Sequence, residues 1–388
     1  MVLKTAEALQ ISNSSSQFTN NLYNILAGTS PGNIVFSPVS LHAVLSMVYQ
    51  GAQDTTAEKF ASSLKVPDAK VASDGYSVIM KRLTYIPNVT LLMAIKIYLM
   101  EGHPVLPDFS ETVTNNFLCD VQLLNFCDQA AAAATINTWV EEKTQEKIMN
   151  LVNKEDFDES TQLVLVNAIY FKSRWRHAFD KGATKTEPFY LNDTDSVPVQ
   201  MMYMKRRCYH NSIMELEAQM LELPYANGNL SMVIILPFER NGIAELEKKL
   251  TTVNLAKITN EVYNPPITVA LPKFKIEQTI DLKDSLTKLG LGEIFDRSAA
   301  NFSGMVTSKE PLHVSKVIQR AFIEVSEEGS DPPPVPAAAA GRRRRGRLCH
   351  VEGPDMFFTA DHPFVFMLLE KSTGTHILFT GKIMNPQL

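Results

Sequence analysis

The strongest constraint on the fold of this chain is residues 327–357, whose composition is unlike that of a packed core. The segment reads EEGSDPPPVPAAAAGRRRRGRLCHVEGPDMF, with four prolines within five residues and five arginines within six. Neither a helix nor a central strand accommodates these prolines, and adjacent arginines repel one another and stay solvated. Strong strand patterns end near Val325 and resume near Phe358. We therefore expect an exposed loop held by a rigid scaffold.

The rest of the chain predicts a large α+β unit. Helices are expected early, at 12–27, at 38–50 and at about 130–152, from apolar spacing and cap residues such as Ser37-Pro38 and Asp128. Apolar strand patterns follow at 163–171, 230–236, 267–274, 313–325, 365–369 and 376–383. The order lacks a βαβ rhythm, which favours α+β. No linker interrupts the sequence before residue 330, so a single domain over 1–388 is expected.

Composition and motifs exclude several functions. The net charge of −5 argues against nucleic acid or an acidic membrane as a partner, and no apolar run is long enough to span a bilayer. Four scattered cysteines, Cys119, Cys127, Cys208 and Cys349, predict free thiols. We find no catalytic motif and no histidines at metal-ligand spacing, so neither an enzyme nor a metal or cofactor site is predicted.

The arginine-rich loop itself suggests a partner. An exposed, basic and flexible segment on a rigid scaffold is the kind of substrate that trypsin-like proteases cut. Two alternatives remain open at this point: a basic loop without consequence, and a site for polyanions or for nuclear import at Arg342–Arg345. The N-terminus lacks the apolar core of a secretory signal. We nevertheless expect an extracellular monomer, with the cytoplasm as the alternative.

Four motifs, in order along the chain, resemble those of the serpin family. They are NIVFSPVS at 33–40, LVNAIYFK at 165–172 followed by Trp175, FTADHPFVF at 358–366, and TGKIMNP at 380–386. The resemblance implies three β-sheets, eight or nine helices and a metastable native state. It also implies an exposed reactive-centre loop. In serpins a protease cleaves this loop and is acylated, and the loop then inserts into the main sheet and distorts the enzyme.

The resemblance also assigns roles to residues outside the loop. Asn167 is an amide within an apolar strand, which on pattern alone is either a satisfied core group or a polar lock. The family match favours the lock, a sheet-opening cluster made of Ser37, Ser40, Asn167 and Gln319. Serpins usually carry a histidine where this chain has Gln319, so a pH gate is not expected here. Glu327 and Lys273 match a family ion pair at the top of the sheet.

The hinge of the loop departs from the family pattern. After Glu-Glu-Gly, serpins usually continue with small residues that slip between strands. Here the hinge is Glu327, Glu328, Gly329, Ser330, Asp331, Pro332, Pro333, Pro334, Val335 and Pro336. Prolines cannot donate to a sheet ladder, so we expect a non-inhibitory protein that is cleaved as a substrate. A working suicide-substrate inhibitor is the alternative, and a polyanion-binding loop is a third.

The cleaved bond is predicted to lie in the arginine cluster. Counting 14 residues forward from Gly329, as the family does, gives Arg343. Counting back 11 residues from Pro363 gives Glu352, so the loop is 9 residues longer than the common form. The candidate residues around the bond are Arg343, Arg344, Arg345, Gly346, Arg347 and Leu348. Arginine suits an acidic specificity pocket, and four consecutive arginines also suit a furin-like protease.

Overall fold

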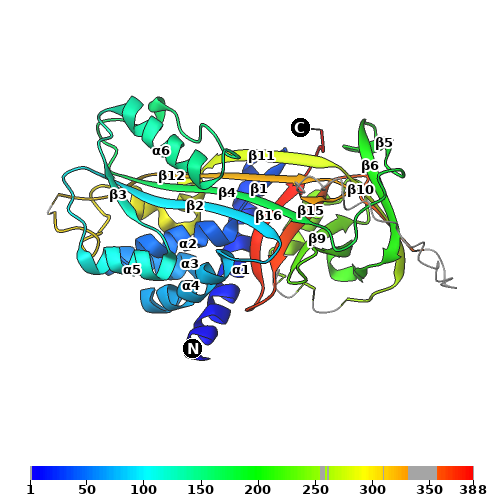
Figure 1. Ribbon diagram of the computed structural model, residues 1–388, viewed down its shortest axis with the longest axis horizontal. Helices are drawn as coiled ribbons and strands as arrows, with labels where there is room; N and C mark the ends of the chain where they lie inside the picture. The colour runs from blue at the N-terminus through cyan, green and yellow to red at the C-terminus, as the bar shows by residue number, and fades with distance from the viewer. Residues whose placement is uncertain (1, 254–257, 260–261, 309, 331–355, 388) are drawn as a thin grey trace, which may run out of the picture.

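The computed structural model describes residues 2–253, 258–259, 262–308, 310–330 and 356–387 (Figure 1). The candidates for the cleaved bond, Arg343 to Leu348, and the hinge residues from Asp331 to Pro336 lie outside the described residues. In the described part, no helix is both long and apolar enough to cross a membrane.

Eight α-helices occur in the described part of the chain, as expected. They are α1 (Val2–Thr29), α2 (Pro38–Tyr49), α3 (Asp54–Leu64), α4 (Ala69–Leu83), α5 (Pro107–Phe117), α6 (Gln129–Lys143), α7 (Ile243–Leu250) and α8 (Lys283–Leu286). Pro38 occupies the first turn of α2, as the sequence predicted, and the Asp128 carboxylate caps α6 by accepting from the Ala131 amide. Short helical turns, η1 (Lys154–Asp156), η2 (Met214–Leu216), η4 (Thr287–Leu291) and η5 (Gly292–Phe295), complete the helical structure.

The strands form three sheets, which confirms the α+β serpin-fold prediction. The main sheet runs β11 (Phe274–Asp281), β12 (Val314–Val325), β4 (Leu163–Arg174), β2 (Val89–Met100) and β3 (Val121–Leu124), with β13 (Gly329–Ser330) on β4. A second sheet runs β1 (Ile34–Phe36), β16 (His376–Ile383), β15 (Phe364–Glu370), β9 (Leu230–Pro237), β8 (Ala218–Pro224) and β7 (Tyr209–Ile213). The small sheet runs β14 (Met356–Thr359), β10 (Pro266–Pro272), β6 (Ser196–Arg207) and β5 (Lys185–Tyr190).

The main sheet is covered on both faces, which explains its continuous apolar sequences. Alternate residues of β4 point to opposite sides. Leu163, Leu165 and Ile169 join the large core. Val164 and Val166 join a smaller core under α6. Figure 1 shows α6 on one side of this sheet and α2 to α5 on the other.

Three predicted boundaries were wrong. The helix expected at 12–27 starts at Val2 and ends at Thr29. The helix expected to reach residue 152 ends at Lys143, because Gln145 and Glu146 adopt positive φ values that a helix excludes. The single strand expected at 267–274 is two strands, β10 and β11, which belong to different sheets and meet at Lys273.

The close approach of two strands in the second sheet generates a stability prediction. A Cβ atom on Gly381 of β16 would overlap the carbonyl oxygen of Ile34 on β1. We expect Gly381→Ala to lower the free energy of unfolding by about 1–3 kcal/mol, since a packed backbone must shift. Gly32→Ala is the matched control, because its added methyl group meets no atom within 4 Å. Equal thermal midpoints for the two variants would contradict the prediction.

Candidate functional site

The hinge begins at the top of the main sheet, where backbone hydrogen bonds hold it. The amides of Trp175 and Phe179 donate to the carbonyls of Glu328 and Glu327 at 2.9 and 2.8 Å. The indole N–H of Trp175 donates to the Ser326 carbonyl at 2.9 Å. The segment that follows β4 therefore fixes three consecutive carbonyls, from Ser326 to Glu328, where the hinge begins.

Gly329 and Ser330 form a two-residue strand, β13, antiparallel to the end of β4. Gly329 lies opposite Arg174 and Ser330 lies opposite Ser173. Gly329 has a φ of +148°, and a Cβ atom there would overlap the Ser173 carbonyl oxygen. Glycine is therefore required at this position.

The Ser330 side chain is fully buried and points into the protein. Its Oγ lies 2.6 Å from the Tyr225 hydroxyl oxygen, at hydrogen-bond distance. The Tyr225 ring stacks on the Trp175 indole with 4.4 Å between centroids. The first inward-facing hinge residue is thus anchored to the group of aromatic side chains that also binds the hinge backbone.

The expected partners Glu327 and Lys273 form an ion pair with 3.0 Å between carboxylate and ammonium. Thr184 donates a second hydrogen bond to the same carboxylate at 2.9 Å. Burial alone would raise the pKa of Glu327, but the hydrogen bonds from Lys273, its own backbone and Thr184 outweigh burial and lower it. Glu327 is therefore anionic at neutral pH and tethers the start of the loop to Lys273, at the junction of the small and main sheets.

The structure brings Ser37, Ser40, Asn167 and Gln319 together beneath the main sheet. Gln319 of β12 lies directly opposite Asn167 of β4, and all four side chains are buried. The Gln319 Oε1 accepts a hydrogen bond from the Ser37 amide at 2.8 Å, and its Nε2 donates one to the Ser37 carbonyl at 3.0 Å. Asn167 Oδ1 accepts from Ser40 Oγ at 3.0 Å and from Gln319 Nε2 at 3.2 Å. These bonds join the two strands to the start of α2.

The cluster is not fully satisfied within the described part of the chain. Asn167 Nδ2 and Ser37 Oγ are buried without a hydrogen-bond partner there. Each such group costs about 1–3 kcal/mol in the closed sheet. Because Gln319 is neutral, it cannot titrate, and the cluster itself carries no pH response. That it acts as the opening point of the sheet stays a prediction.

Sequence reasoning missed two residues of this site. Tyr225, which binds Ser330, lies at the turn after β8, and Thr184 lies in an irregular segment before β5. Neither carries a pattern that marks it, because each becomes important only through contacts with residues more than 100 positions away. In the described residues, no group of three or more His, Cys, Asp or Glu side chains is placed to hold a metal ion.

Comparison with known proteins gives the same assignment as the fold. The family model described as serpin (serine protease inhibitor) matches residues 13–386. Leukocyte elastase inhibitor A of Rattus norvegicus is 34% identical over 97% of this chain and 100% of its own. Serine protease inhibitor 42Dd of Drosophila melanogaster is 33% identical over 97% of this chain and 98% of its own. The crystal structure of Serpin48 from Tenebrio molitor superposes with a TM-score of 0.86 at 30% identity, covering 97% of this chain and 98% of that one. The chain belongs to the serpin family.

The polar cluster generates a second prediction. Asn167→Ala removes the acceptor shared by Ser40 and Gln319. We expect it to lower the free energy of unfolding by about 1–3 kcal/mol, because buried donors lose a partner. Asn115→Ala, on the exposed face of α5, is the control and should stay within about 0.5 kcal/mol of the parent. Thermal and urea denaturation measure both variants, and equal losses would contradict the assigned bonds.

The Glu327–Lys273 pair generates a prediction about pH. Since the pKa of Glu327 lies below its ordinary 4.5, the pair stabilises the folded state above that value and the contribution is lost as pH falls through the lowered pKa. We expect Glu327→Gln to cost about 1 kcal/mol at pH 7 and to show a flatter decline than the parent below pH about 4.5. Glu159→Gln, at an exposed site, is the control. Parallel pH curves for parent and Glu327→Gln would exclude this role.

Proposed function

We propose that this serpin presents its arginine-rich loop to trypsin-like serine proteases and is cleaved as a substrate, without trapping the enzyme. A furin-like protease is the next candidate because of the consecutive arginines. The chain itself is proposed to have no catalytic activity, because its sequence carries none of the common catalytic motifs. Named relatives are serine protease inhibitors, which supports a protease as the partner.

The observation that carries this proposal is the burial and register of Ser330. Ser330 faces inward and lies opposite Ser173 on an antiparallel strand. If the loop continued into the sheet in the same register, Pro332 would lie opposite Phe171, Pro334 opposite Ile169, and Pro336 opposite Asn167. Side chains alternate along a strand, so all three proline rings would face the core beside Ser330.

The same register shows which hydrogen bonds to β4 and β12 an inserted loop would lack, because proline has no N–H. The Trp175 amide donates to the Glu328 carbonyl, so these two residues form a hydrogen-bonded pair. Such pairs recur at every second residue of an antiparallel ladder. Pro332, Pro334 and Pro336 therefore fall where an N–H should donate to β4, and Pro333 falls where one should donate to β12.

The missing hydrogen bonds would raise the energy barrier to insertion, and insertion must be faster than hydrolysis of the acyl-enzyme. Four carbonyls left without a donor cost on the order of 4–12 kcal/mol, at about 1–3 kcal/mol each. Insertion must also break the direct pairing of β12 with β4. Each 1.4 kcal/mol of added barrier slows insertion about tenfold. Hydrolysis of the acyl-enzyme is therefore proposed to finish first.

A working inhibitor is the second candidate. It is favoured by the hinge residues Gly329 and Ser330, which already pair with β4 as the start of an inserted strand would. Polyanion binding by Arg342–Arg345 is a third candidate. It would be indicated by salt-sensitive retention on heparin that is lost when the four arginines are replaced.

Incubation with trypsin tests the main proposal. We expect a cleaved chain, undiminished trypsin activity and no covalent adduct on SDS gels. The cleaved chain should show no gain in thermal stability. N-terminal sequencing of the fragments identifies the bond, which we expect near Arg343. An SDS-stable adduct with the parent chain would overturn the substrate assignment.

Two variants make this experiment decisive. Replacing Pro332, Pro333, Pro334 and Pro336 with alanine restores four donors, and we expect this variant to form adduct and to gain heat stability on cleavage. Replacing the five arginines at 342–345 and 347 with glutamine should prevent cleavage in the loop. If the alanine variant forms no adduct either, the prolines are not the cause of the missing inhibition.

A further inference from the structure

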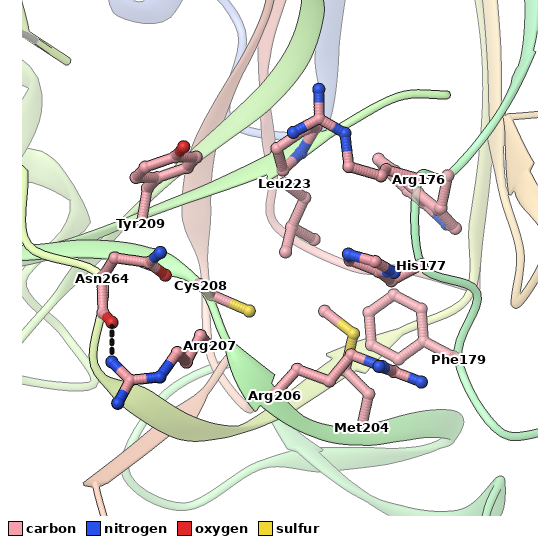
Figure 2. Close-up of a pocket in the computed structure, with 12 residues that line it drawn as sticks. Arg176, His177, Phe179, Met204, Arg206, Arg207, Cys208, Tyr209, Leu223 and Asn264 are labelled. Atoms are coloured by element: carbon pink, nitrogen blue, oxygen red, sulfur yellow. Dashed lines mark hydrogen bonds between the residues drawn. The ribbon is translucent and has the colours of Figure 1, made fainter. Parts of the chain in front are cut away.

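A small pocket opens beside the top of the main sheet, away from the polar cluster. It has a volume of about 120 Å³ and is lined by β6, β8, the start of β7, the turn before β10 and the segment after β4. Figure 2 shows the side chains that surround it. Neither the family comparison nor the proposed loop chemistry assigns a role to this pocket.

The floor of the pocket is apolar and buried. Trp175, Phe179, Leu223 and Cys208 are each at most 6% exposed and line it together with Met204. Burial raises the pKa of the Cys208 thiol to about 11, although Arg206 opposes the shift, so this side chain is neutral at physiological pH. A ligand would meet aromatic, aliphatic and sulfur atoms here, which favours an apolar ring.

The mouth of the pocket is cationic. Arg176, Arg206 and Arg207 line it, and Figure 2 shows Arg176 on the side opposite Arg207. Arg207 donates to the Asn264 carbonyl at 2.9 Å, which keeps its side chain at the edge. In the described part of the chain, no Asp or Glu lines the pocket to neutralise these charges.

The pKa of His177 is consistent with positive potential in the pocket. Its pKa is lowered, first by burial and then by the charges of Arg206 and Arg176. Both guanidinium groups therefore lie close enough to act on His177, which lines the same pocket. An anion at the mouth of the pocket would meet uncompensated positive charge, and guanidinium groups bind carboxylates with paired hydrogen bonds.

The pocket is held in shape by backbone hydrogen bonds between its walls. The Arg176 amide donates to the Pro224 carbonyl at 2.9 Å, and the Cys208 amide donates to the Pro265 carbonyl at 3.2 Å. The walls therefore do not need to be ordered by a ligand, which lowers the cost of binding.

We propose that this pocket binds a small aromatic carboxylate, with the ring on the apolar floor and the carboxylate between the arginines. The pocket, at about 120 Å³, is somewhat smaller than the cavity of about 150 Å³ that encloses benzene, so one ring would fill it and the carboxylate would lie at its open mouth. This inference does not depend on how the loop behaves, since all the residues that it uses lie outside the hinge.

Quenching of Trp175 fluorescence tests the proposal. The chain has two tryptophans, so Trp139→Phe leaves Trp175 as the reporter. We expect 4-nitrobenzoate to quench its emission saturably, and the neutral isostere 4-nitrobenzamide to bind at least about tenfold more weakly. Higher salt should weaken the binding of 4-nitrobenzoate and leave the binding of 4-nitrobenzamide unchanged.

Two double variants with the same change in net charge distinguish binding in the pocket from nonspecific electrostatic attraction of the ligand to the protein. In the Trp139→Phe background, Arg176→Gln with Arg206→Gln should weaken 4-nitrobenzoate binding at least about tenfold. Lys59→Gln with Arg297→Gln changes net charge equally at exposed sites outside the pocket and should leave the affinity unchanged. Unsaturable quenching, equal binding of the two ligands, or equal affinities of the two double variants would each overturn the proposal.

Discussion

The structure depends on the direct pairing of β12 with β4, which closes the main sheet. The two strands run parallel and are matched from Val314 opposite Leu163 to Phe322 opposite Tyr170. A strand that enters between them must replace every ladder bond that it breaks. Under the proposed function, prolines in an entering strand would leave some of these bonds unmade, because proline has no backbone N–H.

One short segment connects the hinge, the sheet and the pocket. Trp175 donates hydrogen bonds to the carbonyls of Ser326 and Glu328, stacks on Tyr225 and lines the floor of the pocket. The Tyr225 hydroxyl in turn lies at hydrogen-bond distance from the Ser330 hydroxyl. Because interiors are densely packed, a shift of one of these aromatic groups must be accommodated by the others. The top of the main sheet thus behaves as one packed unit.

The polar cluster shows why a buried amide can persist in an apolar strand. Asn167 and Gln319 face each other across the two strands and are both tied to the start of α2. Their hydrogen bonds fix the register of β4 against β12 and the position of α2 beneath them. The Asn167 Nδ2 group, however, has no hydrogen-bond partner in the described residues, so the closed sheet leaves one buried donor unpaired. Gln319 has no titratable group, so this balance does not depend on its protonation.

The sequence alone determined the family, the α+β class and the residues that meet in the polar cluster and in the Glu327–Lys273 pair, since the motifs that identify them are local. It misplaced the end of α6 and merged β10 with β11, because left-handed residues and a change of sheet leave little trace in apolar spacing. Only the tertiary structure decided that Ser330 faces inward, that Tyr225 and Thr184 hold the hinge, and that three arginines surround an apolar pocket. Those features depend on contacts between distant segments, which no local pattern encodes.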